Sequence, residues 1–404
     1  MRQELPKLLV ISEKSAPHPE TLIGWPVCRL GFRPFYLSAA VFACISLVLW
    51  VSILHGVMPL PLDMPPALWH AHEMLFGFAV AVIVGFLFTA VKAWTGLPTP
   101  RGWQLAALVA VWALARVAPW TGSYEIYATL DMALLPIAAA VLLRLLIRAG
   151  NQRNMPLISL LVLMALTNAT FHLAVMGVVH ISAHGVLHGQ LALILMVIII
   201  MAGRVIPMFT QNVTPGLVIQ PTPRLEKALL IVTIVALLSW VLEAPNSLTG
   251  ISATLAFALH ARRLWQWQPR VTRNRPILWV LHASYAWVPF GFVLLAFSKW
   301  GWLAESLAIH AFAVGAVGGL IMGMITRTAR GHTGRMLETS RAEIVAYACV
   351  MLAASVRVFM PWVAPALYVQ AIEVSALLWV LAFGLYVWVY GPWLMQTRLD
   401  GKDG

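Results

Sequence analysis

Charged residues and cysteines are scarce in this chain, and each shortage excludes a class of protein. Only 10% of the 404 residues are charged, whereas 61% are hydrophobic. A soluble domain does not need so much apolar surface, so this balance favours a chain that lies in a membrane. Cys28, Cys44 and Cys349 form no CxxC motif, which argues against a disulfide framework and against a thiolate metal site.

Nucleotide-binding motifs are missing, and carboxylates within the apolar stretches are few. The chain has no Walker motif and no stretch long enough for a soluble domain, which argues against an ATP-driven pump. Asp131, Glu305 and Glu373 are the main acidic residues in the apolar stretches, and we expect them near helix ends or isolated. A proton- or sodium-coupled transporter usually needs carboxylates near the membrane midplane, so the pattern disfavours that class.

Apolar stretches of about 20 residues recur along the chain and predict an all-α polytopic membrane protein. We count twelve with short connections: 36–55, 66–91, 103–118, 124–148, 155–179, 183–208, 226–243, 247–264, 277–299, 302–328, 340–362 and 364–390. They divide the chain into a cytoplasmic segment at 1–30, a membrane domain at 31–395 and a cytoplasmic tail at 396–404. The polar start has no cationic segment leading directly into a short apolar core, so we expect no cleaved signal peptide.

The net charge of +12 is distributed in a way that predicts topology rather than a nucleic-acid partner. Of the 27 Lys and Arg residues, 24 fall in the N-terminal segment, the C-terminal tail and the loops after even-numbered helices. Only Arg116, Lys299 and Arg357 fall on the opposite side. Membrane proteins keep Lys and Arg in cytoplasmic loops, so we expect both termini in the cytoplasm, the bilayer around the helices, and no nucleic acid.

Histidines gather at the outer membrane face in this orientation. Eight of the twelve fall in the outer half of a helix or in an outer loop: His55, His70, His72, His172, His180, His184, His188 and His310. The second, sixth and tenth helices each carry histidine near the same end. Imidazole within lipid is costly, so this repeated placement indicates ligands, and haem iron and copper are metals that buried imidazoles bind. Without a CxxCH motif, any haem would be held non-covalently.

The predicted haem ligands are His70, His72, His310 and His188. His70 and His72 point about 200° apart on a regular helix, so one pocket cannot take both. Glu73 follows His70 by three residues and is expected to orient its imidazole. The glycines after His310 would let helices or a flat macrocycle approach closely: Gly315, Gly318, Gly319 and Gly323. Alternatively, the first pair bonds to loop carbonyls at the interface, and the deeper histidine only packs against a neighbouring helix.

The predicted ligands of a further metal are His184, His188 and His172. His184 and His188 are four residues apart and share a helix face, which suits two ligands to one copper ion. The same spacing suits one haem ligand with a propionate or water partner, or two residues that line a wet outer mouth. His172 is a further candidate in the outer half of the fifth helix.

On the cytoplasmic side, other polar residues are candidates for a proton path or for orienting a cofactor. Arg204 lies at an inner helix end, where a cation also meets the helix dipole favourably. His282 would ligate a second cofactor, join a proton path with Tyr285, or simply be packed and hydrogen-bonded. The GHTGR loop carries His332 and Arg335, and it would bind an anion, guide protons or form a structural turn.

The regular spacing of the histidine-bearing helices suggests three four-helix repeats. Each of these helices begins with histidine and ends with a cation, which is Lys92, Arg204 or Arg327. The catalytic subunit of haem–copper oxidases has the same spacing, which is an analogy of architecture only. The seventh helix here lacks the copper-binding histidines of that subunit, and the tenth has one histidine instead of two. This argues against a binuclear centre of the oxidase kind.

Four segments resemble the NnrS family of bacterial inner-membrane proteins: GFRPFY at 31–36, WHAHEMLFG at 69–77, GRVIPMFT at 203–210 and GHTGR at 331–335. The resemblance extends from about residue 24 to residue 390. It implies a protein of the nitric oxide response that contains haem and copper. Carried over by position, the histidines of the family are here His70, His72, His184, His188, His282, His310 and His332.

From the residues and the resemblance together, we expect a b-type haem held by the second, sixth and tenth helices near the outer face, with copper as an additional metal. Such a site would bind nitric oxide and detoxify it, or reduce it to N2O with electrons from quinol. Two other classes stay open. One is a polytopic transporter or metal-handling permease, and the other is a nitric oxide sensor that signals through the GHTGR loop.

Overall fold

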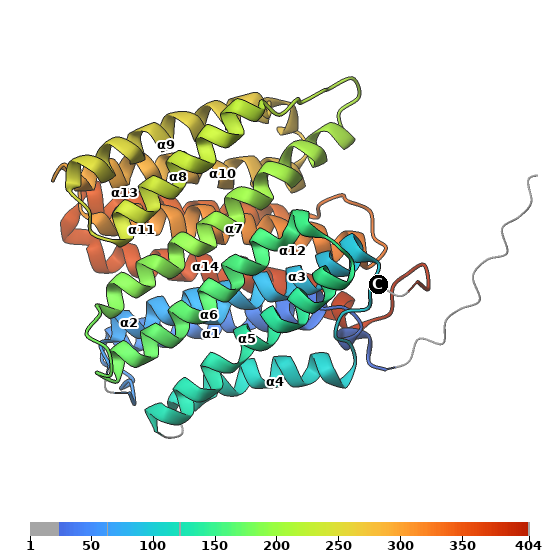
Figure 1. Cartoon of the computed structure of the whole chain (residues 1–404), viewed down its shortest axis with the longest axis horizontal. Coiled ribbons are helices and arrows are strands. Elements are labelled where there is room, and N and C mark those ends of the chain that lie inside the picture. The colour runs from blue at the N-terminus through green and yellow to red at the C-terminus, as the bar shows by residue number, and fades with distance from the viewer. Residues whose placement is uncertain (1–23, 63, 121–122, 403–404) are drawn as a thin grey trace, which may run out of the picture.

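The computed structural model describes residues 24–62, 64–120 and 123–402, and all regular structure among them is helical. The long helices lie side by side in one bundle (Figure 1). The predicted all-α class is therefore confirmed. Residues 1–23 of the predicted cytoplasmic segment, His18 among them, lie outside the described residues.

The described part of the chain forms twelve long helical spans, which agrees with the predicted number. Ten are single helices: α1 (Phe32–Leu54), α4 (Trp103–Val117), α5 (Tyr124–Arg148), α6 (Met155–Val175), α7 (Ala183–Asn212), α8 (Pro223–Val241), α9 (Asn246–Gln266), α10 (Pro276–Lys299), α13 (Arg341–Val363) and α14 (Tyr368–Met395). The second span is composed of α2 (Pro66–His72), the π-helix η2 (Glu73–Ala79) and α3 (Val80–Thr95). The tenth is composed of α11 (Glu305–His310), the π-helix η6 (Ala311–Gly318) and α12 (Gly319–His332).

Ten of the described spans are long and apolar enough to cross a membrane. The other two, α8 and α9, have 19 and 21 residues, so they match their neighbours in length. α8 has three charged residues near its start, Arg224, Glu226 and Lys227, and α9 is less apolar. Short 3₁₀ turns flank several helices: η1 (Pro26–Cys28), η3 (Ala118–Trp120), η4 (Gln152–Asn154), η5 (Pro269–Thr272) and η7 (Pro365–Leu367). The chain is therefore a multi-pass membrane protein.

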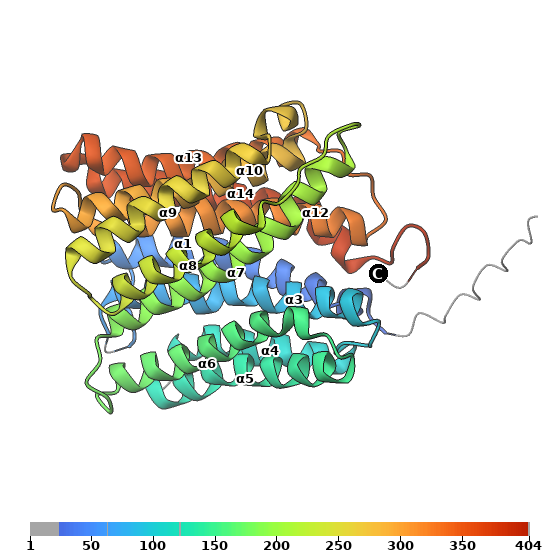
Figure 2. The same ribbon diagram turned by 45° about the horizontal axis from the view of Figure 1, so that its top comes forward.

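The three spans that carry the outer histidines form the inside of the bundle. α2–α3, α7 and α11–α12 surround two cavities that all three of them line. Groups of three outer helices fill the gaps between them: α4–α6 between α3 and α7, α8–α10 between α7 and α12, and α13, α14 and α1 between α12 and α3 (Figures 1 and 2). The second, sixth and tenth spans therefore lie inside the bundle, with three outer helices between one inner span and the next.

Both composite spans change from α-helix to π-helix directly after a histidine. The π-helix η2 begins one residue after His72, and η6 begins one residue after His310. A π-helical turn holds more residues than an α-helical turn, so the side chains after it point in directions that a regular helix would not give. Such segments are frequent at functional sites.

Local signals fix the outer starts of two inner helices. Pro66 occupies the first turn of α2, where its missing N–H leaves no bond unmade. Ser182 caps α7, and its hydroxyl accepts a backbone N–H at 3.3 Å. This cap places His184 and His188 in the first two turns of α7, at the same end of the bundle as His70.

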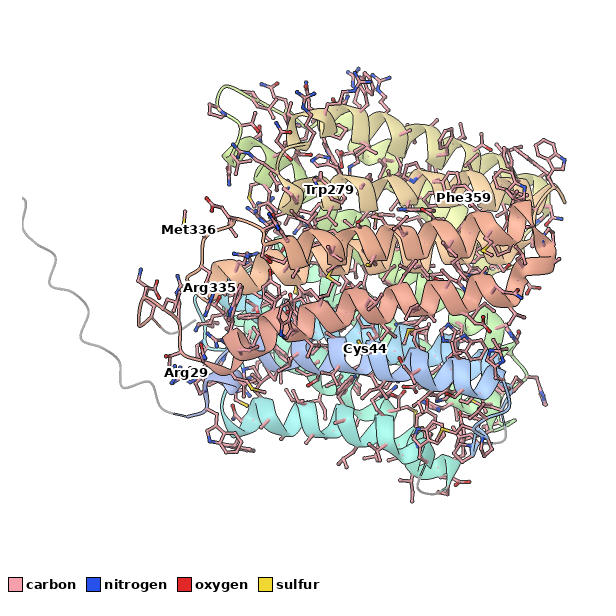
Figure 3. The ribbon with its side chains drawn as sticks, turned by 180° about the vertical axis from the view of Figure 1, so that it is seen from behind. Arg29, Cys44, Trp279, Arg335, Met336 and Phe359 are labelled. Atoms are coloured by element: carbon pink, nitrogen blue, oxygen red, sulfur yellow. The ribbon has the colours of Figure 1, made fainter. Side chains whose placement is uncertain are left out.

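Both ends of the described chain lie at one end of the bundle. The guanidinium of Arg33, at the start of α1, donates to the carbonyls of Leu394 and Gln396 at the end of α14, at 3.0 and 2.7 Å. Arg29 and Arg335 both lie at this end in Figure 3. An even number of spans requires this arrangement. The side of the membrane on which this end lies stays a prediction from the charge distribution.

Candidate functional site

A cavity of about 280 Å³ lies between the inner helices, near the end of the bundle opposite the chain ends. Most of its wall is apolar, with residues such as Phe78, Leu191 and Trp379. Its basic side chains come from four different spans: His70, His184, His188, His310 and Arg357. The structure thus brings four of the predicted ligands to one space, whereas His72 and His172 lie elsewhere.

His310 is held in one orientation by its own helix. Its Nδ1 lies 2.7 Å from the carbonyl oxygen of Ser306, one turn earlier. A carbonyl oxygen only accepts, so Nδ1 carries the proton and Nε2 keeps its lone pair. Histidines that bind metals commonly donate their second N–H to a carbonyl in this way, so His310 has the arrangement of a metal ligand.

His70 lines the same cavity from α2. Its ring stacks on Trp50, with the centroids 4.6 Å apart and the planes inclined at 18°. Its Nδ1 is buried and has no hydrogen-bond partner among the described residues. A buried polar atom without a partner destabilises a protein, so a group bound in the cavity that bonds to this imidazole would stabilise it.

Arg357, on α13, is a buried cation without an anionic partner in the described part of the chain. It is 7% exposed, and its only hydrogen bond among the described residues is a long one, from Nη2 to the hydroxyl of Tyr368 at 3.3 Å. Its Nη1 has no partner, and no carboxylate lines the cavity among the described residues. A guanidinium inside a membrane protein is normally paired, so an anionic group in the cavity would balance it.

His184 and His188 lie one turn apart on α7 and line the same cavity. The ring of His188 stacks on Trp240, with the centroids 4.7 Å apart and the planes inclined at 22°. Its Nδ1 lies 3.9 Å from Glu305, whose carboxylate also accepts from the indole of Trp240 at 2.6 Å and from Lys299 at 2.7 Å. A carboxylate therefore lies beside one of the predicted copper ligands.

His72 points away from the cavity into a buried polar cluster between α2, α5 and α6. Its Nε2 lies 3.2 Å from Oδ2 of Asp131, and Nε2 of His172 lies 3.1 Å from the same oxygen. These three side chains are at most 3% exposed. As their angular separation predicts, His70 and His72 face different sites. Asp131, predicted to lie near a helix end or to be isolated, lies in the second turn of α5 and is the centre of this cluster.

Glu73 belongs to the cluster around His72 and does not orient His70 as predicted. Its carboxylate accepts from Arg116 at 2.6 Å and from the hydroxyl of Tyr127 at 2.8 Å, and it lies 3.3 Å from Nδ1 of His72. The physical reason is that a buried carboxylate is stabilised most by a guanidinium, and Arg116 reaches it from α4. Helical spacing alone carries no information about that neighbour.

Three cations that the sequence did not single out as site residues take part in these polar sites. Arg116 joins the cluster around His72, Lys299 binds the carboxylate beside His188, and Arg357 lines the cavity. A signal was available, because these three are the exceptions to the positive-inside distribution. Because few cations depart from the positive-inside distribution, those that do indicate where polar sites lie.

The glycines after His310 serve helix packing rather than the approach of a macrocycle. A Cβ at Gly315 would collide with the ring of Trp287, and a Cβ at Gly323 would collide with Leu281, both on α10. The close contact of α10 with η6 and α12 requires these small residues. The alternative of ordinary helix packing therefore accounts for them.

The cytoplasmic candidates do not form one continuous path among the described residues. Nε2 of His282 lies 2.9 Å from a threonine hydroxyl of α7, whereas the hydroxyl of Tyr285 lies 2.6 Å from Nδ1 of His260. Arg204 donates at 2.7 Å to the asparagine side chain that precedes α6. These residues therefore join neighbouring helices in separate contacts.

The GHTGR segment forms the C-terminal cap of α12. Gly334 has a φ of 74°, which glycine adopts without strain, and the backbone N–H of Arg335 bonds to the last turn of the helix at 2.9 Å. The ring of His332 packs against Phe32 with centroids 5.4 Å apart, and the guanidinium of Arg335 lies 4.3 Å from the centroid of Trp393. Of the alternatives, this geometry favours the structural turn.

The cavity has the features that a non-covalently held haem requires. It offers imidazoles from different spans for the iron, an unpaired guanidinium for a propionate, and an apolar wall for the macrocycle. The cluster around His72 does not line this cavity.

The family of the chain follows from comparison with known proteins. No curated protein matches the chain. The model of the family described as NnrS protein matches residues 26–398, which include every described helix from α1 to α14. The chain therefore belongs to the NnrS protein family, as its four sequence segments predicted, and is a membrane protein of the nitric oxide response.

Proposed function

We propose that this protein binds haem b in the cavity between the inner helices and uses it to bind and detoxify nitric oxide. One observation carries the proposal. The lone pair of His310, the unpaired Nδ1 of His70 and the unpaired guanidinium of Arg357 belong to side chains that line the same apolar space. Bound haem would supply an iron that binds nitric oxide in the ferrous state.

Each basic residue of the cavity has a defined part in this proposal. His310 and His70 are the proposed haem ligands, since they come from different inner spans and each has a nitrogen for which a bound group can supply the partner. Arg357 offers its charge to a haem propionate. His184 and His188 are the proposed copper ligands, because they lie one turn apart on one face of α7.

The apolar wall suits the proposed substrate. Nitric oxide is small and uncharged, so it reaches an apolar cavity through the bilayer without a hydrophilic channel. The same wall keeps water and ions away from the bound group, which strengthens the electrostatic contacts that hold it. Binding would therefore be selective for small neutral molecules.

We further propose that the bound nitric oxide is reduced, according to 2NO + 2e⁻ + 2H⁺ → N2O + H2O. Quinol is the proposed electron donor because it is dissolved in the same bilayer as the protein. Simple sequestration would also lower the concentration of nitric oxide, so the formation of N2O by the purified protein with quinol is the measurement that separates the two.

The haem is tested first, by the reduced-minus-oxidised visible spectrum of the purified protein with and without nitric oxide. We expect α and β bands of a b-type haem in the wild type, which shift when nitric oxide is added. His310→Ala and His70→Ala remove proposed ligands, so the bands should be lost or strongly altered in both variants.

His260→Gln is the matched control for these variants. His260 is also a buried imidazole, but the hydroxyls of Thr233 and Tyr285 satisfy its two nitrogens at 2.9 and 2.6 Å. Its replacement should leave the haem bands unchanged. A colourless wild type, purified from cells supplied with haem, would refute the proposed function.

A transporter or metal-handling permease is the less supported alternative. The cavity has no carboxylate among its described lining residues. The deep carboxylates of Glu73 and Asp131 are held by Arg116, which limits their freedom to bind and release a coupling ion.

A further inference from the structure

We propose that His72, Asp131 and His172 bind a divalent first-row transition-metal ion at a site separate from the cavity. Each residue offers one ligand atom, and the three atoms all lie within 4.8 Å of one another. None of the three lines the cavity that holds His70 and His310. The proposal therefore does not depend on the haem.

The protonation of His72 follows from its contacts. The hydroxyl of Tyr127 donates to Glu73 at 2.8 Å, and its oxygen lies 2.8 Å from Nδ1 of His72. The hydroxyl proton of Tyr127 is donated to Glu73, so the hydroxyl oxygen can only accept from His72. Nδ1 of His72 therefore carries a proton and donates it to that oxygen. In a neutral imidazole only one nitrogen carries a proton, so Nε2 of His72 has a lone pair.

This lone pair faces two further acceptors. The amide nitrogen of Asn168 donates to Oδ2 and to the carbonyl of Asp131, at 2.8 and 3.2 Å, which fixes the orientation of the amide. Its oxygen therefore faces Nε2 of His72, at 3.3 Å, beside Oδ2 of Asp131 at 3.2 Å. Three electron pairs converge on one point, and a cation must lie there.

The charges of the cluster also call for a cation. Glu73 and Asp131 contribute two negative charges, and Arg116, which binds both, contributes one positive charge. The side chains of all three are at most 5% exposed, so water does not screen the remaining negative charge. A buried net charge is unfavourable inside a membrane protein, and a bound cation offsets it.

A second imidazole favours a metal ion over a proton on His72. Nε2 of His172 lies 3.1 Å from Oδ2 of Asp131, so it points at the same oxygen as His72. Its Nδ1 lies 2.9 Å from the hydroxyl of Tyr124, just as Nδ1 of His72 is held by Tyr127. A proton needs one such nitrogen, whereas paired imidazoles with braced outer nitrogens are typical of metal sites.

The ligand atoms indicate the class of metal. Two imidazole nitrogens and one carboxylate oxygen, without a thiolate, suit copper(II), zinc(II) or iron(II) better than the hard cations magnesium and calcium.

The test is the metal content of the purified full-length protein, measured by mass spectrometry after loading with copper, zinc or iron(II) and dialysis. Haem iron is measured separately from the visible spectrum and subtracted. We expect the wild type to retain the ion, and His172→Gln and Asp131→Asn each to retain one ion per chain less. Tyr124→Phe removes only the hydroxyl that braces His172 and should weaken metal binding by about 10–100-fold.

Two comparisons make each outcome decisive. His260 is a buried imidazole whose nitrogens bond to two hydroxyls, so the His260→Gln variant should keep the metal content of the wild type.

If the buried variants do not fold, X-ray absorption at the metal edge of the wild type must show two imidazoles and an oxygen ligand. A folded wild type without a non-haem ion, or a His172→Gln variant that retains it, overturns the proposal. A colourless protein that holds the ion would refute the haem and leave this site standing.

Discussion

At the scale of single residues, Arg357 is the clearest link between the cavity and the proposed haem. Three other buried guanidinium groups have a carboxylate partner among the described residues, namely those of Arg116, Arg263 and Arg330. Arg357 has only the hydroxyl of Tyr368 within the described residues. An unpaired charge in a membrane is costly, so an anionic group bound in the cavity would stabilise Arg357.

We predict that Arg357→Gln loses haem, because the propionate is left without its counter-charge. A hydrogen bond to a charged group contributes about 1.5–3 kcal/mol, so the affinity for haem should fall by about tenfold or more. Haem per protein, read from the visible spectrum at limiting haem supply, measures the loss. Arg357→Lys keeps the charge and should retain more haem than Arg357→Gln.

Arg327→Gln is the control for a nonspecific effect of removing a buried arginine. Arg327 is also 8% exposed, but its guanidinium lies over the ring of Phe209 and does not line the cavity. If both arginine variants lost haem equally, the contact between Arg357 and a propionate would not be the cause.

At the scale of helices, the tenth span depends on close packing against α10. It places Gly315, Gly319 and Gly323 against that helix, and Gly315 faces the ring of Trp287. Interiors are packed densely, so a single added methyl group must displace a neighbour. Here the neighbour is a large, partly buried indole rather than the end of a flexible side chain.

We predict that Gly315→Ala lowers the stability of the protein by about 1–3 kcal/mol because it overpacks this contact. Thermal unfolding in detergent, followed by tryptophan fluorescence, measures the effect. Gly384→Ala on α14 is the matched control, since a Cβ there meets nothing within 4 Å. It should be neutral or stabilise the protein by up to about 1 kcal/mol through helix propensity. Equal melting temperatures for the two variants would contradict the packing argument.

At the scale of the whole molecule, the bundle has two ends of different character. The loops at the end that holds both chain ends contain most of the Lys and Arg residues, whereas the histidine sites lie near the other end. This separation assigns the sites to the outer half of the membrane if the basic end is cytoplasmic. Substrate and metal would then reach the sites from the outer side or from the bilayer.

We predict that a reporter fused after the last residue lies in the cytoplasm. Green fluorescent protein should be fluorescent there and alkaline phosphatase inactive, because the phosphatase folds only outside the cytoplasm. A fusion after Trp302, between α10 and α11, should give the opposite result. An active phosphatase at the C-terminus would reverse the orientation of the bundle.

The fold class and the number of spans could be predicted from the sequence, because membrane helices follow from the length and apolar character of local segments. The sequence also placed His70, His184, His188 and His310 on the second, sixth and tenth spans, since helix order and loop charge fix the end at which each residue lies. The angular argument that separates His70 from His72 was local as well and needed only the helical period.

Only the tertiary structure decided which polar groups meet. Glu73 was assigned to His70 by spacing, but Arg116 on another span holds it beside His72. Asp131 looked isolated along the chain, yet α6 brings His172 to it. The reason is physical, because pairing between buried charges depends on distance across the bundle and the distance between residues in the sequence does not encode it. The sequence therefore identifies the candidate site residues, and the packing of the helices determines which of them line the cavity and which form the separate cluster.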